Sequence, residues 1–133
     1  MADGDVIYYD ATADEFKIGP VPSTSGGVKV YKAYWTQTGT DAPLLQATID
    51  NDFGGVFTLG RSDVGDYTAN LTNAFPDADK FYPLTIMCQS VDKPLMFTIR
   101  RTSADEIAIQ VFDPAGTAVD LQGRIAIGFE QHP

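Results

Sequence analysis

Residues 95–111 read LMFTIRRTSADEIAIQV, and the alternation in this stretch decides the fold class that we expect. Apolar and polar side chains take turns on both sides of the turn-forming residues 102–105. Strict alternation is typical of a β-strand that has one buried face and one face in water. The stretch therefore predicts two antiparallel strands joined by a tight hairpin. Their expected core-facing residues are Leu95, Phe97 and Ile99 on the first strand, and Ile107, Ile109 and Val111 on the second.

The same alternation recurs along the chain from residue 28 to the end. Strand starts lie about ten residues apart, which suits antiparallel hairpins and leaves no room for the crossover helices of a parallel sheet. We expect an all-β fold, a jelly-roll-like antiparallel β-sandwich of about eight strands. Further residues expected to face the core are Leu45, Ala47, Ile49, Ile125, Ile127 and Phe129. The expected strands span 28–36, 44–50, 55–61, 66–72, 81–90, 95–102, 105–113 and 123–131.

Residues 1–27 differ in composition from the body at residues 28–133 and predict a separate N-terminal docking arm. They hold five acidic residues and one lysine, and they end in a Pro/Ser/Gly-rich linker at residues 19–27. Upstream, two short strand-like runs flank a turn, so we expect a hairpin or an extended arm. An isolated hairpin is marginally stable in water, so this one needs a surface to pack on, unless the segment is a flexible tail. The expected contact residues of the arm are Val6, Ile7, Tyr8, Tyr9, Phe16 and Ile18.

Composition limits the classes of partner. The chain has 133 residues, 18 acidic and 9 basic, and a net charge of −9. Such a charge repels nucleic acid phosphates and anionic lipid headgroups, so we expect neither nucleic acid nor membrane as a partner. No apolar stretch approaches the roughly 20 residues that cross a bilayer. The first five residues, MADGD, lack the features of a secretory signal, and we expect synthesis in a cytosol.

Residues suited to catalysis are scarce. His132 is the single histidine and stands next to the C-terminus, where order is usually poor, so neither a His base nor a Ser-His or Cys-His constellation is expected. The acidic groups at residues 50–52 and 77–79 lack the further oxygens of a calcium loop, and we expect their Asp side chains to cap turns. Cys88 has no disulfide partner and is expected to be a small buried residue. We predict a protein that is not an enzyme and uses no cofactor or metal.

Aromatic residues are the better indication of function. Tyr31, Tyr34 and Trp35 lie on the first expected strand of the body. Because adjacent side chains on a strand point to opposite faces, one member of the pair Tyr34-Trp35 should point away from the core. Exposed Trp and Tyr anchor protein contacts and also stack on sugars. We interpret the three residues as a subunit or ligand contact, with ordinary core packing as the alternative.

Several short motifs occur together in the first half of the body. Residues 36–43 read TQTGTDAP, residues 54–55 are Gly-Gly, and residues 65–67 read GDY, shortly before LTNAF at 71–75. This combination resembles a group of small β-rich virion structural proteins of tailed bacteriophages and prophages. The resemblance covers about residues 31–75 and, more weakly, residues 99–107. The chain departs from the pattern at Tyr34-Trp35, where smaller aliphatics are expected, and at Asp41, where the group has Asn.

The resemblance implies a function in the phage particle. It implies a non-enzymatic head (capsid) decoration, head-fibre or tail-fibre subunit, made in the host cytoplasm, located in the virion and assembled as a homotrimer. The arm fits attachment to a capsid or tail protein through residues 1–27. The alternative is a carbohydrate-binding module or adhesin that recognises a host glycan through exposed aromatics such as Trp35. A small hydrolase with paired Asp residues is the third hypothesis.

Overall fold

The computed structural model describes residues 5–10, 15–20, 27–88 and 94–133, with side chains from residue 27 onward. The first two ranges are the strands β1 (Asp5–Asp10) and β2 (Glu15–Pro20), which pair antiparallel. The backbone of the expected hairpin is therefore present. Most of the Pro/Ser/Gly linker lies outside the described residues. So do the expected side-chain contacts of Val6, Ile7, Tyr8, Tyr9, Phe16 and Ile18.

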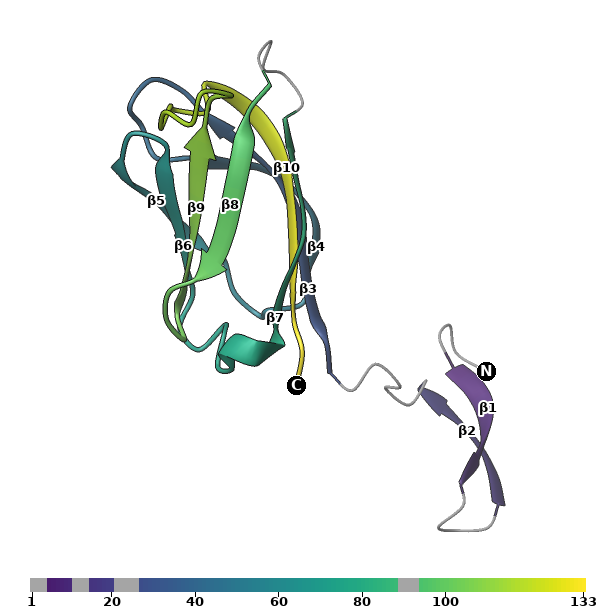
Figure 1. Cartoon of the computed structure of the whole chain (residues 1–133). Coiled ribbons are helices and arrows are strands. Elements are labelled where there is room, and N and C mark those ends of the chain that lie inside the picture. The colour runs from purple at the N-terminus through teal and green to yellow at the C-terminus, as the bar shows by residue number, and fades with distance from the viewer. Residues whose placement is uncertain (1–4, 11–14, 21–26, 89–93) are drawn as a thin grey trace.

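Two four-stranded antiparallel sheets form the body of the described chain and lie face to face (Figure 1). Sheet I has the order β4-β3-β10-β7, and sheet II has the order β5-β6-β9-β8. The all-β antiparallel sandwich that the sequence predicts is confirmed. The elements are β3 (Lys29–Gln37), β4 (Leu44–Asn51), β5 (Thr58–Asp63), β6 (Asp66–Asn70), the 3-10 helix η1 (Ala78–Lys80), β7 (Phe81–Cys88), β8 (Met96–Arg101), β9 (Glu106–Phe112) and β10 (Gly123–Gln131).

Hairpins keep the pairs β3-β4, β5-β6 and β8-β9 within one sheet, whereas every other connection of the body crosses between the sheets. The first and last strands of the body, β3 and β10, pair along their full length at the centre of sheet I. The middle of the outward side of sheet I is therefore formed by β3 and β10, the first and last strands of the body.

The core fills the space between the sheets. Ile107, Ile109 and Val111 of β9 are at most 1% exposed, and Ile125, Ile127 and Phe129 of β10 are at most 3% exposed, as their alternation predicts. Leu95, Phe97 and Ile99 are half-buried near or on the edge strand β8 and pack against this core. Connecting segments add rings: Phe53, Phe57 and Phe75 surround Phe129, with ring centroids 5.6–5.7 Å from it. Burial of such side chains contributes roughly 1.5–3 kcal/mol each.

Strand β4 departs from the predicted pattern. Ile49 is 63% exposed, and Ala47 stands opposite Tyr34 on the outward side, so the expectation that these two residues face the core is wrong. Leu45 stands opposite the core residue Trp35, on the expected side, but is 42% exposed on this edge strand. The pairing of β4 with β3 shifts register twice, between Lys32 and Ala33 and between Tyr34 and Trp35. Each shift is a β-bulge, in which two residues of β4 oppose one residue of β3. A bulge interrupts the two-residue period, and the hydrophobic pattern alone does not reveal where that happens.

The expected turn-capping role of the acidic groups is confirmed at residues 77–79, whereas at residues 50–52 the turn is capped by Asn51 and Asp52 binds the neighbouring strand. Asp77 caps η1, because its Oδ1 accepts a hydrogen bond of 2.9 Å from the N–H of Asp79. At the other group, Oδ2 of Asp52 accepts from the N–H of Val30 at 3.2 Å. Asn51, the residue between the two Asp of that group, spans its turn by accepting from the N–H of Phe53 and donating to the carbonyl of Gly55.

Candidate binding face

The outward sides of the two sheets differ in chemistry. Directly opposite residues of an antiparallel pair share a face, so the register assigns each side chain to a side. On sheet II the outward positions are mainly polar, with Thr98 opposite Gln110 and Thr68 opposite Ala108. Thr98 donates a hydrogen bond of 3.3 Å to Gln110. This side is an ordinary solvated surface.

Sheet I presents a more apolar outward side, which we call the outer face. The register places Tyr34, Ala126 and Met87 in one row across β3, β10 and β7. Thr36 and Arg124 form the next row toward one end, and Lys32 and Gly128 form the next row toward the other. Its exposed large hydrophobic residues are Leu44 (68%), Ile49 (63%), Tyr82 (61%) and Met87 (64%).

The two bulges of β4 add side chains to this face. At the first bulge, Ile49 is the extra residue, and it lines a hollow together with Tyr34 and Ala126. At the second bulge, Gln46 is the extra residue, and it lines a neighbouring hollow with Thr36. Bulges commonly redirect a side chain in this way. The edge strand therefore contributes more to the outer face than a regular strand of the same length would.

The first hollow is small and apolar, with a volume of about 190 Å³. Its lining includes the short outward side chain of Ala126 together with Ile49, Tyr34 and Thr85. Gly128, in the next row of β10, has Thr85 and Lys32 at 3.4–3.5 Å from the place of a Cβ. The middle of the outer face is therefore low, because small residues occupy β10.

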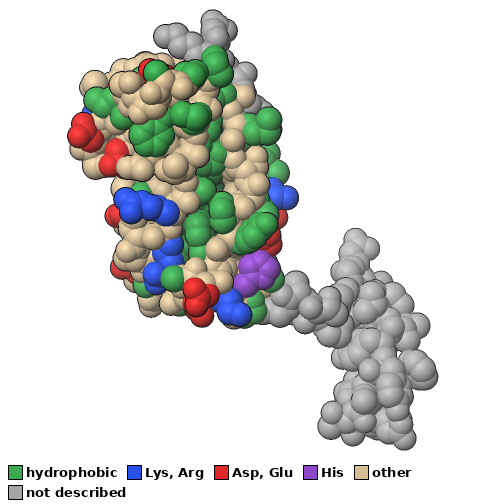
Figure 2. Space-filling model, viewed as in Figure 1, with side chains coloured by type: hydrophobic (Ala, Val, Ile, Leu, Met, Phe, Trp, Pro, Cys, Tyr) green, Lys and Arg blue, Asp and Glu red, His purple; other side chains and the backbone are tan. Residues whose placement is uncertain are grey.

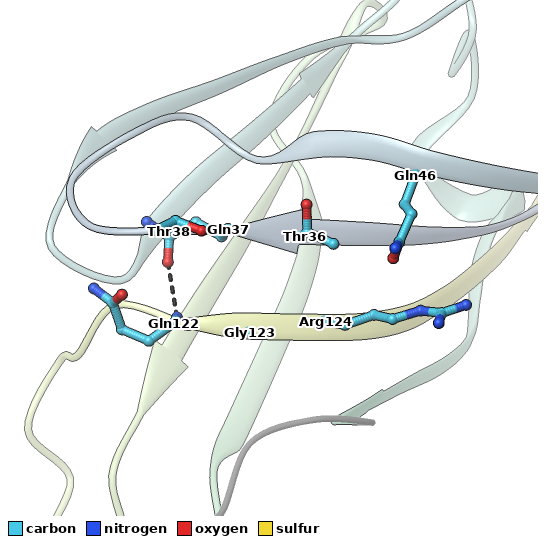
Figure 3. Close-up of a pocket in the computed structure, with 7 residues that line it drawn as sticks. All are labelled: Thr36, Gln37, Thr38, Gln46, Gln122, Gly123 and Arg124. Atoms are coloured by element: carbon cyan, nitrogen blue, oxygen red, sulfur yellow. Dashed lines mark hydrogen bonds between the residues drawn. The ribbon is translucent and has the colours of Figure 1, made fainter.

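The second hollow is polar, with a volume of about 330 Å³. Figure 3 shows its residues: Gln46 comes from β4, Thr36 from β3, and Arg124 lies along β10. The guanidinium carbon of Arg124 lies 4.1 Å from the centre of the Tyr34 ring, a cation-π contact that joins the two hollows. Hydroxyl, amide and guanidinium groups thus stand beside an aromatic ring.

Two glutamines fix the end of the polar hollow. Gln37 is 2% exposed, and its Oε1 accepts a hydrogen bond of 2.9 Å from the N–H of Gln122 (Figure 3). Its Nε2 donates to the carbonyls of Gly39 and Asp41. Gln122 in turn accepts from the N–H of Gly39 and donates to its carbonyl, both at 2.9 Å. The motif TQTGTDAP, which runs from the end of β3 to the start of β4, is therefore held by hydrogen bonds to the segment before β10.

The sequence-predicted contact residues divide between the two sides of β3. Tyr34 lies on the outer face, but Tyr31 is 2% exposed and Trp35 is 1% exposed. The interpretation of Tyr31 and Trp35 as subunit or ligand contacts is wrong, because strand alternation turns both toward sheet II. In the core, Nε1 of Trp35 donates a hydrogen bond of 3.0 Å to the hydroxyl of Tyr31. That bond satisfies both polar groups, and burial raises the pKa of Tyr31.

Asp120 is the centre of the strongest electrostatic cluster among the described residues. Arg61 binds it in a bidentate manner, with Nε and Nη2 at 3.0 and 2.9 Å from the two carboxylate oxygens. The hydroxyl of Tyr67 and the N–H of Gly65 also donate to Oδ1, at 2.9 and 3.0 Å. The hydrogen bonds from Arg61 are the main cause that lowers the pKa of Asp120 to about 2.

This cluster was not foreseen from the sequence, and its geometry is structural. Tyr67 accepts from the N–H of Leu121 at 2.9 Å, and burial raises the pKa of its hydroxyl. The cluster thereby ties β5 and β6 to the segment before β10. Gly65 has a φ of +66° and no room for a Cβ, which would lie 2.5 Å from the carbonyl oxygen of Val119. Oδ1 of Asp120 thus accepts three hydrogen bonds and Oδ2 accepts one, all from groups within this cluster.

Other reactive groups stand apart. Nε2 of His132 lies 3.6 Å from Oε2 of Glu130. The backbone N–H of His132 donates a hydrogen bond of 2.8 Å to the carbonyl of Lys80. Cys88 is half-buried on β7, and burial raises the pKa of its thiol. Across residues 27–88 and 94–133, no group of three or more His, Cys, Asp and Glu is arranged to hold a metal ion. The same residues contain no helix with the length and hydropathy of a membrane span.

A third hollow follows the open side of the sandwich, where the edge strands β7 and β8 face each other. It has a volume of about 360 Å³ and is lined by Leu84 and Ile86 on one side and Phe97 and Ile99 on the other. Figure 2 shows hydrophobic side chains in the band between the two sheets. These residues are the margin of the core, left uncovered because neither sheet closes on itself.

Comparison of the chain with protein-family models, curated proteins and solved structures finds no match.

Proposed function

We propose that this chain is a non-enzymatic structural protein of a bacteriophage virion. In this proposal the sandwich is the displayed body, and residues 1–27 attach it to a capsid or tail protein. Copies of the chain assemble into a homo-oligomer, with a trimer as the expectation from the resemblance. A head decoration, a head fibre and a tail fibre all fit this plan.

One observation supports the proposal above the others: β1 and β2 form a two-stranded sheet of their own, and neither strand belongs to sheet I or sheet II. A lone hairpin is marginally stable in water and gains stability when a further surface covers it. The hairpin strands are rich in apolar residues: DVIYYD has an Asp at each end, and EFKIGP begins with Glu15 and ends with Pro20. A segment of this kind is suited to docking on a partner.

The test is attachment to particles. Deleting residues 2–27 should leave a folded body that no longer sediments with phage particles of the cognate type. A matched variant with Ile7→Asp and Ile18→Asp keeps the chain length and should lose attachment as well. The control, Val56→Asp with Met96→Asp, changes two exposed apolar residues of the body and should attach as the unaltered chain does. Full occupancy of particles by the truncated body would refute the attachment role of the arm.

Carbohydrate binding is the second candidate function, and the polar hollow is the observation that favours it. Thr36, Gln46 and Arg124 offer the hydroxyl, amide and guanidinium groups that bind sugar hydroxyls, and Tyr34 stands beside them. Trp35 no longer supports this function, because it is buried. A glycan array separates the candidates: a sugar-specific signal that Gln46→Ala abolishes would favour an adhesin, and a blank array would favour assembly alone.

A further inference from the structure

Exposed apolar residues are unevenly distributed over the two sheets. Leu44 and Ile49 stand on the edge strand β4, and Tyr82 and Met87 stand on the opposite edge strand β7, all on the outer face and all more than 60% exposed. On the outward side of sheet II, Met96 is the large hydrophobic residue of comparable exposure among the described residues. A surface with apolar residues along both edges is typical of an interaction site.

The shape of the outer face suits packing against the same face of a second copy of the chain. The two edge strands carry the large side chains, whereas the central strand β10 carries Ala126 and Gly128. The apolar hollow of about 190 Å³ lies over this low middle. A large side chain from the edge of another copy can therefore rest on the small residues in the middle of this one. Self-complementarity of this kind is what symmetric interfaces require.

The size of the face is sufficient for a specific contact. Its strands have up to nine residues. At about 3.3 Å per residue and about 4.8 Å between strands, four strands make a face of roughly 30 by 19 Å. The projected area is roughly 600 Å², and the accessible surface of a rough face exceeds its projection. Standard interfaces use about 800 Å² of accessible surface per partner. One contact therefore occupies nearly all of the face.

Charge also favours a second copy. The chain as a whole has a net charge of −9, which makes two copies repel each other at most orientations. On the outer face the charged outward residues are balanced: Lys32 and Arg124 are opposed by Asp50 and Glu130. Lys32 stands directly opposite Asp50 across the β3-β4 pair. The face therefore adds no repulsion of its own to that between whole chains, whereas a strongly acidic or basic partner gains nothing from it.

We propose that the outer face of sheet I is the surface through which copies of this chain contact one another. The inference rests on the proposed homo-oligomer and names the surface that it uses. Because one contact occupies nearly all of the face, this surface joins copies in two-fold pairs and not in the trimer expected from the resemblance. It assigns the large residues of β4 and β7 to the interface, and it leaves the polar side of sheet II in solvent.

The test is the molar mass of the full chain by light scattering coupled to gel filtration. The unaltered protein should have a mass of at least twice the 14.4 kDa of one chain. Ile49→Asp with Met87→Asp should weaken self-association at least ten-fold, because two charges would enter an apolar contact. The matched control, Val56→Asp with Met96→Asp, adds the same charge outside the outer face and should keep the mass of the unaltered protein.

A second variant guards against misfolding of the first. Ala126→Gln adds bulk without charge in the low middle of the face and should also reduce the mass, while the far-ultraviolet circular dichroism spectrum stays unchanged. A single-chain mass for the unaltered protein at every concentration would overturn the inference, and so would an oligomer that both face variants leave intact. A single chain whose Ile49 and Met87 resonances shift on addition of a glycan would assign the face to sugar instead.

Particle attachment distinguishes this inference from the proposed function. An Ile49→Asp and Met87→Asp variant that is a single chain but still sediments with particles supports the interface and keeps the attachment role of the arm. Loss of attachment on deletion of residues 2–27, with the oligomer retained, would show that the arm and the outer face act separately, as proposed. An oligomer lost on that deletion alone would place the contact in the arm and overturn the assignment of the outer face.

Discussion

Asp120 illustrates how one carboxylate can stabilise a loop-rich part of a sandwich. Its two oxygens receive hydrogen bonds from Arg61, Gly65 and Tyr67, which lie on or next to the β5-β6 hairpin. Asp120→Asn removes the negative charge and leaves the mostly buried guanidinium of Arg61 without its ion pair. We expect a loss of about 2–3 kcal/mol in the free energy of unfolding, measured by urea denaturation. Unfolding at the same urea concentration as the unaltered chain would contradict this role.

The pH dependence of stability provides a second measure of the same residue. The pKa of Asp120 is about 2 in the folded chain and 3.8 when unperturbed, so the folded state favours the ionised carboxylate. Its contribution is therefore fully present above pH 3.8 and is lost as the pH falls through about 2. We expect the difference in unfolding free energy between the unaltered chain and Asp120→Asn to shrink over this window. A difference that stays constant down to pH 2 would rule out the linkage.

Tyr34 and Trp35 are neighbours in sequence but differ in what they stabilise. Trp35→Ala opens a cavity in the core and removes the donor to the Tyr31 hydroxyl, for which we expect a loss of about 3–5 kcal/mol. Tyr34→Ala loses only a cation-π contact with Arg124 at the outer face, for which we expect about 1 kcal/mol or less. Urea denaturation midpoints of the two variants check the contrast. Equal losses would mean that the outer face contributes to the fold as much as the core does.

At the scale of elements, the hairpin β1-β2 and the body should be energetically independent. β1 pairs with β2, and neither strand extends sheet I or sheet II. Deletion of residues 2–27 should therefore change the urea midpoint of the body by less than the midpoint's experimental error, while attachment to particles is lost. A large decrease in the midpoint would mean that the hairpin packs on the body of its own chain.

The alternation of residues 95–111 was sufficient to predict β8 and β9, because each side chain on those strands is either in the core or on the polar side. Strand β4 was predicted in place but with the wrong face for Ala47 and Ile49, since two bulges interrupt its period. The sequence also placed one ring of the Tyr34-Trp35 pair on each side, as the structure has it, but did not tell which. The cluster around Asp120 joins residues more than fifty positions apart, and no local pattern indicates such a contact.

At the scale of the whole molecule, the salt dependence of self-association follows from the distribution of charge. Copies with a net charge of −9 repel each other, and salt shortens the range of that repulsion to about 10 Å at 0.1 M from about 30 Å at 0.01 M. The outer face loses little by screening, because its positive and negative charges are equal in number. We therefore expect self-association to become tighter as sodium chloride is raised through this range, measured by sedimentation equilibrium of the full chain. Lowering the pH toward the sequence pI of about 4.2 should act in the same direction by removing the net charge. Association that weakens with salt would instead mean that ion pairs such as those available to Lys32 and Asp50 dominate the contact, and that the apolar edges of the face are not its main source of affinity.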